Sequence, residues 1–493
     1  MTRKVRTKRS GGANLASFCP APVVAPHPLV LLLLVEAVMA FELQFYFPQD
    51  GGRGLVVGLY ASVIWTMPLG ITCMAAYGAV LAGRDVRRHA TLPPPAPVRE
   101  LVIVQIPTIA RRDVLPALTR VVASFEEYMP AYFRHWRVDV VAEESCDTKR
   151  ELEAMTSANV RVLYVPSAYR TRGGAERKAR ANQWINELRG TVGEARADVW
   201  VLHMDDDTGI GPDTAPAMAR VINDNPAGLL DRVDMAQGVL TYPRGFALKF
   251  WPWVADAIRP GSDLSLFRLS TGRGRPFIGA HGELLLVRAS TEARIGWDFG
   301  RHLSITEDAN FALLFACRSQ GRSTWFPARS YGSSPESLRD LATQRRRWSR
   351  GLMHVVLNRG IPWRCRLLLG YALTAWLLGP FQHFAFVLGI GALLGHTNTS
   401  PVVRDLAFLW SWNMGVVLWM YVEGMRWNVR ASGLRRVPVR YWFALLAVPV
   451  FTLVEGWAGF RGMIEFARDR LGRGDAELFH VIPKSYEGDA IAS

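Results

Sequence analysis

Long apolar runs occupy both ends of this 493-residue chain and leave a more polar stretch between them. Leu29–Phe47 has about the length that crosses roughly 30 Å of hydrocarbon, and Gly54–Ala82 follows it after a glycine-rich turn. Arg366–Gly395, Leu406–Val422 and Tyr441–Trp457 form the second group. Because a helix satisfies its backbone hydrogen bonds internally, these runs predict transmembrane helices on either side of a soluble domain.

The net charge of +15 comes mostly from arginine. Residues 1–10 (MTRKVRTKRS) are strongly basic, and the loop 426–440 carries five arginines. By the positive-inside rule both segments face the cytoplasm, so we expect a multi-pass protein of a bacterial inner membrane with a cytoplasmic middle. Contact with anionic membrane lipid and the codon bias of a GC-rich genome are alternative explanations of the arginines. No nucleic-acid-binding signature accompanies them, so no nucleic-acid partner is expected.

The number of spans leaves the side of the C-terminal tail open. Five crossings would place the tail opposite the polar middle. Either Arg366–Gly395 bends back at Pro380, or one of the five runs does not cross. Phe460–Leu471 has the pattern of an amphipathic helix at the membrane surface, and Phe479–Lys484 lies in the polar tail behind it.

The cysteines are widely spaced along the chain. The five lie at positions 19, 73, 146, 317 and 365 and form no C-x-x-C pair. We therefore expect neither a disulfide framework nor a structural zinc site, which fits a reducing cytoplasm.

Strand and helix patterns alternate in the polar middle of the chain. Helical patterns at 114–128 and 175–189 lie between apolar runs that are rich in β-branched residues. This alternation predicts an α/β domain with a mainly parallel sheet, in which ligands bind at the carboxyl ends of the strands. The predicted strands are Leu101–Ile106, Val138–Ala142, Val160–Val165 and Val199–Met204.

Three aspartates follow the last of these strands. Asp205, Asp206 and Asp207 precede Thr208 and Gly209, which suit a tight turn. Carboxylates at i and i+2 of an extended strand end point the same way and can hold Mg²⁺ or Mn²⁺, whose other ligands would be diphosphate oxygens. We predict Asp205 and Asp207 as metal ligands; a solvated acidic turn is the alternative.

A second acidic motif, Thr306-Glu307-Asp308, opens a helical pattern at 309–318. Thr306 is a natural N-cap and acidic residues suit the first turn of a helix, so both carboxylates could be purely structural. In a cleft, such a carboxylate can instead take the proton from an attacking hydroxyl. We predict Asp308 as that base and place Glu307 beside the acceptor.

The third motif is Gln344-Arg345-Arg346-Arg347-Trp348, just before the membrane. Guanidinium geometry suits phosphate oxygens, so we place Arg347 on the leaving diphosphate and Trp348 under the acceptor sugar. Arg345 and Arg346 are expected to face lipid or solvent, and anchoring in lipid remains the alternative for all three arginines. Nucleotide motifs of kinases and dehydrogenases are absent.

The three motifs, in this order and between membrane segments, resemble the family-2 inverting glycosyltransferases, which include cellulose and hyaluronan synthases. Further segments are similar to the egghead-type β-1,4-mannosyltransferases, and the resemblance covers about residues 100–351. These segments are Gln237–Gly245, Ala255–Arg259, Gly279–Gly282 and Gly296–Asp308. Phe479–Lys484 resembles the synthases' gating-loop motif F-x-V-T-x-K, with Ile482 in the threonine position.

The resemblance implies a GT-A fold and a nucleotide-sugar donor, GDP-mannose in the egghead group. Together with the motifs it assigns residues to two sides of one site. Donor contacts are Thr108, Glu143, Glu144, Lys178, Asn182, Asp205 and Arg347, and acceptor contacts are His281, Gly282, Glu307 and Trp348.

The sequence therefore predicts a GT-A catalytic domain inserted between transmembrane helices. It would move one hexose, mannose from GDP-mannose, onto a glycolipid at the cytoplasmic face, with inversion. A processive polysaccharide synthase would use the same site, and a non-enzymatic transporter would leave the motifs unexplained. The predicted units are 1–97 (basic N-terminus, two spans, linker), 98–340 (catalytic domain), 341–365 (interfacial helix), 366–460 (three or four spans) and 461–493 (interfacial helix and tail).

Overall fold

An eight-stranded mixed sheet forms the centre of the catalytic part. The computed structural model describes residues 63–229, 232–244, 249–382, 401–434 and 436–472. The strand order is β3-β2-β1-β4-β7-β6-β8-β5. The strands are β1 (Val98–Thr108), β2 (Phe133–Glu143), β3 (Val160–Val165), β4 (Val199–His203), β5 (Gly209–Ile210), β6 (Val233–Val239), β7 (Leu285–Arg288) and β8 (Arg322–Tyr331).

One half of the sheet is parallel, as predicted. β1 lies between β2 and β4 and is parallel to both, and β3 continues the sheet beyond β2. The four predicted strands are confirmed, with β1 and β2 longer than expected. Their apolar runs are continuous because helices cover both faces of this half: α4 (Leu115–Tyr128) and α7 (Thr214–Asn223) pack on one face, and α6 (Arg177–Thr191) packs on the other.

The other half contains antiparallel pairs that the sequence analysis did not anticipate. β7 is antiparallel to both β4 and β6, and β8 pairs parallel to β6. Because β4 and β7 run in opposite directions, the last residue of β4, His203, pairs with the first residue of β7, Leu285. The loop before β7 therefore arrives beside the acidic turn that follows β4.

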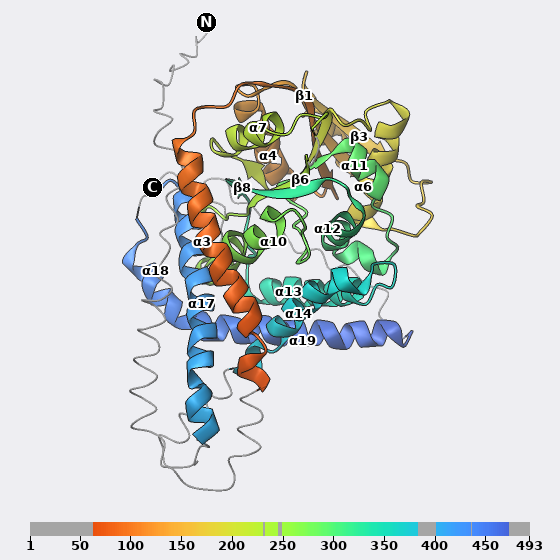
Figure 1. The fold of residues 1–493 in the computed structure, drawn as a ribbon. Coiled ribbons are helices and arrows are strands. Elements are labelled where there is room, and N and C mark those ends of the chain that lie inside the picture. The colour runs from red at the N-terminus through yellow and green to blue at the C-terminus, as the bar shows by residue number, and fades with distance from the viewer. Residues whose placement is uncertain (1–62, 230–231, 245–248, 383–400, 435, 473–493) are drawn as a thin grey trace, which may run out of the picture.

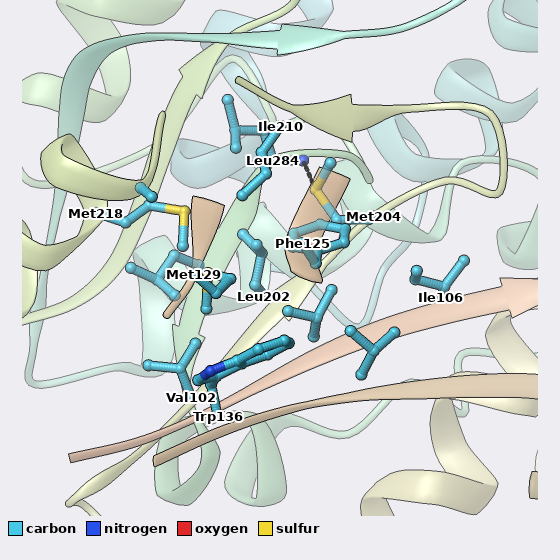
Figure 2. Close-up of a cluster of buried hydrophobic side chains, with 14 of the residues drawn as sticks. Val102, Ile106, Phe125, Met129, Trp136, Leu202, Met204, Ile210, Met218 and Leu284 are labelled. Atoms are coloured by element: carbon cyan, nitrogen blue, oxygen red, sulfur yellow. Dashed lines mark hydrogen bonds between the residues drawn. The ribbon is translucent and has the colours of Figure 1, made fainter. Parts of the chain in front are cut away.

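The main apolar core fills the space between the sheet and α4 and α7 (Figure 2). Phe125 of α4 lies against strand residues such as Leu202, and Trp136 closes one end of the cluster. Phe125 and Leu202 are fully buried. Truncating either to alanine is expected to cost about 2–5 kcal/mol, so this core fixes the strand ends that carry the polar motifs.

The remaining helices surround the sheet and extend away from it on one side (Figure 1). α3 and α17 run side by side, and α19 lies across them beneath α13 and α14. These long helices are α3 (Leu69–Thr91), α13 (Leu338–Val356), α14 (Trp363–Leu377), α17 (Pro401–Ala431) and α19 (Val448–Arg470). The shorter ones are α5 (Lys149–Glu153), α8 (Phe250–Ala255), α9 (Ile258–Ser262), η3 (Asp263–Phe267), α10 (Arg268–Gly272), α11 (Ala289–Ile295), η4 (His302–Ile305), α12 (Glu307–Arg318), α15 (Gly379–Gln382), α18 (Val439–Ala444) and η5 (Leu445–Ala447).

The described residues contain two helical stretches long and apolar enough to cross a membrane, Val63–Thr91 and Val439–Arg470. The first contains most of the predicted run Gly54–Ala82, whereas Leu29–Phe47 lies outside the described residues, as does Phe479–Lys484. Of the run Arg366–Gly395, the structure describes α14, which ends at Leu377, and the short α15; the residues after Gln382 lie outside the described residues. The predicted surface helix Phe460–Leu471 is not separate: it continues the helix that begins at Val448.

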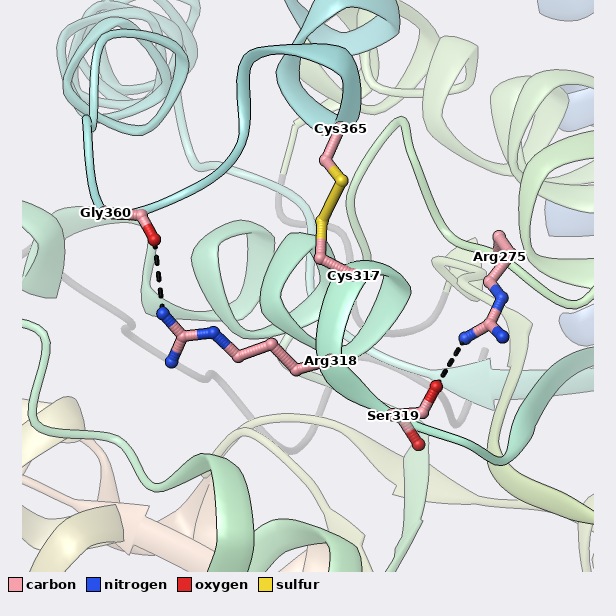
Figure 3. Close-up of a disulfide and its surroundings, with 6 residues drawn as sticks. All are labelled: Arg275, Cys317, Arg318, Ser319, Gly360 and Cys365. Carbon is pink, nitrogen blue, oxygen red and sulfur yellow. Dashed lines mark hydrogen bonds between the residues drawn. A yellow bond between two sulfur atoms is a disulfide. The ribbon is translucent and has the colours of Figure 1, made fainter.

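The expectation that no cysteines pair is wrong. Cys317 of α12 and Cys365 of α14 form a disulfide across a sequence separation of 48 residues (Figure 3). No local pattern revealed it, because the two helices meet only in the tertiary structure, around Leu313, Leu314 and Leu369. The bridge fastens the helix that starts at the second acidic motif to the first helix after the third motif.

Candidate active site

A cavity of about 830 Å³ lies at the carboxyl ends of β1, β2 and β4. Its polar part collects side chains from all three predicted motifs, and its apolar part continues between α3, α14 and α17. The predicted site residues that line it are Thr108, Glu143, Lys178, Asp205, Asp207, His281, Gly282, Glu307, Asp308, Arg347 and Trp348. The fold therefore brings together three motifs that are spread over residues 205–348 of the chain.

Two side chains from outside the acidic turn, Thr108 and Arg120, hold it in place. Asp206 accepts a hydrogen bond from the Thr108 hydroxyl at 2.8 Å, which ties the turn to the end of β1. Arg120 Nη2 donates to the main-chain oxygen of Asp207 at 3.0 Å and supports the other side of the turn. All three aspartates of the turn, Asp205, Asp206 and Asp207, line the cavity.

Lys178 connects the acidic turn to the loop before β7. Its ammonium pairs with the Asp205 carboxylate and donates to the Gly282 carbonyl oxygen at 3.1 Å. A Cβ on Gly282 would lie 2.7 Å from Lys178 Nζ and 3.3 Å from Asp308 Oδ2. A side chain at position 282 would therefore displace the end of Lys178 and crowd Asp308.

Two glutamates in the cavity wall have raised pKa values. Burial, followed by the negative charge of Asp308, raises the pKa of Glu307 to about 7. Burial, followed by Asp205, raises the pKa of Glu283 to about 7. The cavity thus holds more carboxylates than its cations neutralise, which is the electrostatic condition for binding a further positive charge.

The chemistry of this donor set fits Mg²⁺ or Mn²⁺. Hard divalent cations prefer carboxylate oxygens, and Asp205 and Asp207 present such oxygens to the cavity beside Glu283. The Lys178 ammonium neutralises one carboxylate, that of Asp205. The carboxylates near Asp205 still outnumber this single positive charge.

The three arginines of the third motif have different positions. Arg347 lines the cavity, and burial lowers its pKa although Glu307, Asp205 and Asp308 act in the opposite direction. Arg346 is partly exposed and lies 3.4 Å from Glu465. Its neighbour in the sequence, Arg345, is buried.

The prediction that Arg345 faces lipid or solvent is wrong. Its side chain is 3% exposed and forms ion pairs with Asp256 at 2.6 Å and Glu455 at 2.8 Å. The sequence could not reveal these partners, because Asp256 directly follows α8 and Glu455 lies on α19, both far away along the chain. Arg345 thus joins α13 to both helices and supports the cavity wall.

The predicted acceptor side is built around His281 and Trp348. His281 Nε2 lies 2.6 Å from Asp263 Oδ1, and its ring packs against Phe267 at 4.2 Å between centroids. The guanidinium groups of Arg259 and Arg345 lie over the Trp348 ring, 4.6 Å and 4.4 Å from its centroid. Both rings are therefore held in place by charged neighbours.

The predicted donor residues divide into two groups. Glu143 lines the cavity and pairs with Arg180. Glu144 points away, is exposed, and accepts from the Ser167 main-chain nitrogen at 2.7 Å. Asn182 is fully buried behind the wall, where its amide oxygen accepts from Gln105 at 2.7 Å. The structure thus places Glu144 and Asn182 outside the residues that line the cavity.

Glu283, Arg259 and Asp263 belong to the site but were not predicted. Glu283 accepts from the Thr208 hydroxyl at 2.6 Å and lies 3.3 Å from Arg259. Asp263 is fully buried behind His281. Glu283 directly precedes the apolar run Leu284–Val287, and this position in the sequence was a signal that could have identified it. No sequence pattern marks Asp263.

Comparison with protein families and curated proteins gives the following matches. Residues 200–454 match the model "Glycosyl transferase family group 2". "Beta-1,4-mannosyltransferase egh" of Drosophila melanogaster is 24% identical over 370 residues, which cover 74% of each chain. "Beta-1,4-mannosyltransferase bre-3" of Caenorhabditis briggsae is 26% identical over 341 residues, which cover 69% of this chain and 70% of the relative.

Among solved structures, the chain is similar to the mannosyltransferase PcManGT of Pyrobaculum calidifontis in complex with GDP-Man and Mn²⁺. The TM-score is 0.41 at 16% identity, and the match covers 83% of this chain and 99% of the other.

Proposed function

The chain belongs to glycosyl transferase family group 2, and from this premise we propose that it transfers mannose from GDP-mannose to a lipid-linked sugar by a β-1,4 linkage. One observation carries the proposal: a single cavity joins a polar region with Asp205, Asp308 and Arg347 to an apolar region between helices. The mannosyltransferase names of the relatives support mannose as the sugar. The mixed α/β sheet supports a GT-A fold.

The reaction is a single displacement with inversion at the anomeric carbon. The acceptor hydroxyl oxygen forms the new bond to that carbon, the bond to the diphosphate breaks, and Asp308 takes the hydroxyl proton. Arg347 stabilises the negative charge on the departing nucleoside diphosphate. Lys178 fixes Asp205 relative to Asp308 through Gly282.

Asp205 and Asp207 are the residues that would hold Mg²⁺ or Mn²⁺. When bound, such an ion neutralises charge on the donor diphosphate. Glu307 lies beside Asp308, and His281 and Trp348 contribute the wall on the acceptor side.

The apolar part of the cavity supports a glycolipid acceptor. It is lined by Ile71 of α3, Ala375 and Trp376 of α14, and Val417 and Met420 of α17. A soluble sugar would gain nothing from such a surface, whereas a lipid chain would bury apolar area there at about 25 cal/mol per Å². A sugar carried on a lipid can therefore place its hydroxyl at Asp308 and its chain between the helices.

The surface of α19 supports a position at a membrane. Its outward side exposes Val450 (54%), Leu453 (40%), Trp457 (62%) and Ile464 (41%), at spacings that place them on one helix face. The stretch Val439–Arg470, which contains α19, is long and apolar enough to cross a membrane, and α17 is not among the stretches in the described residues that meet this condition. Because α19 runs across the direction of α3 and α17 in Figure 1, we nevertheless place α3 and α17 in the bilayer and α19 along its surface. The stretch Tyr441–Trp457 then does not cross, and the catalytic domain stays on the cytoplasmic side of an inner membrane.

A transfer assay tests the proposal. Purified protein in detergent is given Mn²⁺, a panel of nucleotide sugars and a glycolipid acceptor, and the products are measured by mass. We expect GDP-mannose to be preferred and a single hexose to be added. Preference for another donor would overturn the assignment of the sugar, and long polymers would establish the processive synthase instead.

A pair of variants tests the base. Asp308→Asn should lower transfer by about 10²- to 10⁴-fold while binding of the nucleotide sugar survives. Asp224→Asn, at an exposed position after α7, is the matched control and should be fully active. Full activity of the Asp308→Asn variant would exclude Asp308 as the base.

A further inference from the structure

We propose that His302, His354 and Asp469 form a second metal site, which takes a transition-metal ion of the Zn²⁺ type. One ligand atom from each residue lies within 4.8 Å of the other two. The three residues come from η4, α13 and α19, so the fold and not the local sequence brings them together. The site has its own ligands and does not depend on the identity of donor or acceptor.

His354 already contacts both of the other side chains. His354 Nε2 lies 3.0 Å from Asp469 Oδ2, and the rings of His302 and His354 stack at 4.7 Å between centroids with 16° between their planes. The side chains of His354 and Asp469 are 9% and 1% exposed. His302 is exposed, so its ring can move into ligand position.

The elements that carry the ligands are packed tightly enough to hold a site. A Cβ on Gly351 of α13 would lie 2.7 Å from Thr306 Oγ1, and one on Gly462 of α19 would overlap the Arg346 carbonyl oxygen. Ser349 also donates to the Gly459 carbonyl oxygen at 2.7 Å. α13 is therefore fixed between the Thr306 segment and α19, and rigid elements make precise sites.

Two imidazole nitrogens and one carboxylate oxygen select the type of ion. Such a set suits Zn²⁺, Co²⁺ or Ni²⁺, whereas Mg²⁺ prefers oxygen ligands alone. At Zn²⁺ distances of about 2.0–2.2 Å, tetrahedral ligands lie about 3.4 Å apart. The 3.0 Å distance between His354 Nε2 and Asp469 Oδ2 is close to this spacing. The distances from the His302 nitrogen to these two residues, at most 4.8 Å, shorten to it when the exposed His302 ring turns inward.

Neighbouring charged side chains orient the Asp469 carboxylate. Arg350 donates to both oxygens of Asp469, with Nε 2.7 Å from Oδ2, and so orients the carboxylate. Glu465 lies 3.7 Å from Arg350 and offsets part of its charge.

The position of the site links it to the catalytic machinery. His302 precedes Asp308 in the same segment, and His354 follows Arg347 by about two turns of α13. A bound ion would fix the segment that carries the base to the helix that carries the arginine. The site therefore offers a structural clamp at the junction of the second and third motifs.

The test uses Co²⁺ as a spectroscopic probe on tag-free protein that a chelator has stripped of metal. We expect the wild type to bind Co²⁺ at this site with the visible absorption of nitrogen ligation, and Zn²⁺ to displace this ion and raise the thermal midpoint. The Asp207→Asn variant, which lacks the first site, should give the same spectrum. His302→Ala and His354→Ala should weaken binding by about tenfold or more.

His135→Ala is the matched control, because His135 is exposed on β2 and lies outside the cluster. It should bind Co²⁺ like the wild type. Since His302 is exposed, its alanine variant should keep the metal-free thermal midpoint, and this is measured alongside. Equal Co²⁺ affinity in the His302→Ala and His135→Ala variants would overturn the proposal, and so would loss of the spectrum in Asp207→Asn.

Discussion

Two groups of charged side chains lie next to each other at the end of β4 and differ in their balance of charge. One surrounds Glu292 and His203, the last residue of the strand; the other surrounds Asp205, in the turn that follows. In the first group the charges are balanced. In the second the carboxylates are in excess.

The balanced group is a closed network. Glu292 accepts from Arg189 Nη2 and from Trp297 Nε1, both at 2.7 Å, and lies 3.2 Å from His203 Nε2. Burial alone would raise the pKa of Glu292, but Arg189 and His203 outweigh it and lower the pKa to about 2. This carboxylate is already satisfied within the protein, so the network stabilises the fold and offers nothing to a ligand.

The group around Asp205 is open. Glu283 and Glu307 both have pKa values raised to about 7, because burial and neighbouring carboxylates disfavour their charged forms. They line the cavity, whereas Glu292 does not. The difference teaches that buried charge by itself does not identify a site in this protein; unbalanced charge facing a cavity does.

The largest expected effect comes from removing charge from the open group. Asp207→Asn should lower transfer by about 100-fold or more and weaken activation by Mn²⁺, because a ligand of the ion is lost. Its thermal midpoint should stay close to that of the wild type. Transfer is measured against Mn²⁺ concentration, with Asp224→Asn as the control. Unchanged Mn²⁺ dependence would refute the role of Asp207.

Removing charge from the balanced group should act on stability instead. Glu292→Ala leaves Arg189 buried without its partner, which is expected to cost about 3–5 kcal/mol of unfolding free energy. Denaturant unfolding measures the loss, and the folded fraction should keep its transfer rate. Glu151→Ala, on the exposed face of α5, should change little. A Glu292→Ala variant as stable as the wild type would show that the network is dispensable.

Gly282→Ala tests how closely the open group is packed. The added Cβ would push Lys178 away from Asp205 and crowd Asp308, so we expect about a tenfold loss of transfer. The matched control is Gly190→Ala in α6, where a Cβ would meet nothing within 4 Å. Equal activity of the two variants would mean that the Lys178 contact is not needed for catalysis.

The smallest effect concerns the pH dependence of stability. The folded-state pKa of Glu307 is raised to about 7 from its ordinary value of about 4.5. The stabilisation of the folded state by the protonated side chain is therefore fully present below about pH 4.5 and is lost as the pH rises through about 7. Glutamine mimics the protonated form. The thermal midpoint of Glu307→Gln relative to the wild type should therefore increase between about pH 4.5 and about pH 7. Glu151→Gln should show no such trend, and a constant difference for Glu307→Gln would contradict the raised pKa.

Local patterns were sufficient for the elements and for the central motifs. Apolar runs such as Val160–Val165 predicted buried strands, because parallel strands covered on both faces must be apolar throughout. Asp205 and Asp207 could be predicted as a pair, since their two-residue spacing at a strand end sets their direction. The side-chain environments of Arg345 and Asn182 could not, because burial depends on helices and strands far away in the chain.

The sequence by itself determined the α/β character, the order of the motifs and the presence of apolar helices around them, because these follow from residue periodicity along short segments. Only the tertiary structure decided which motif residues face the cavity, that Cys317 meets Cys365, and that His302, His354 and Asp469 converge. The antiparallel pairing of β7 with β4 likewise brings Glu283 to the acidic turn. The physical reason is common to all of these: contacts between distant segments depend on how whole elements pack, which no local pattern encodes.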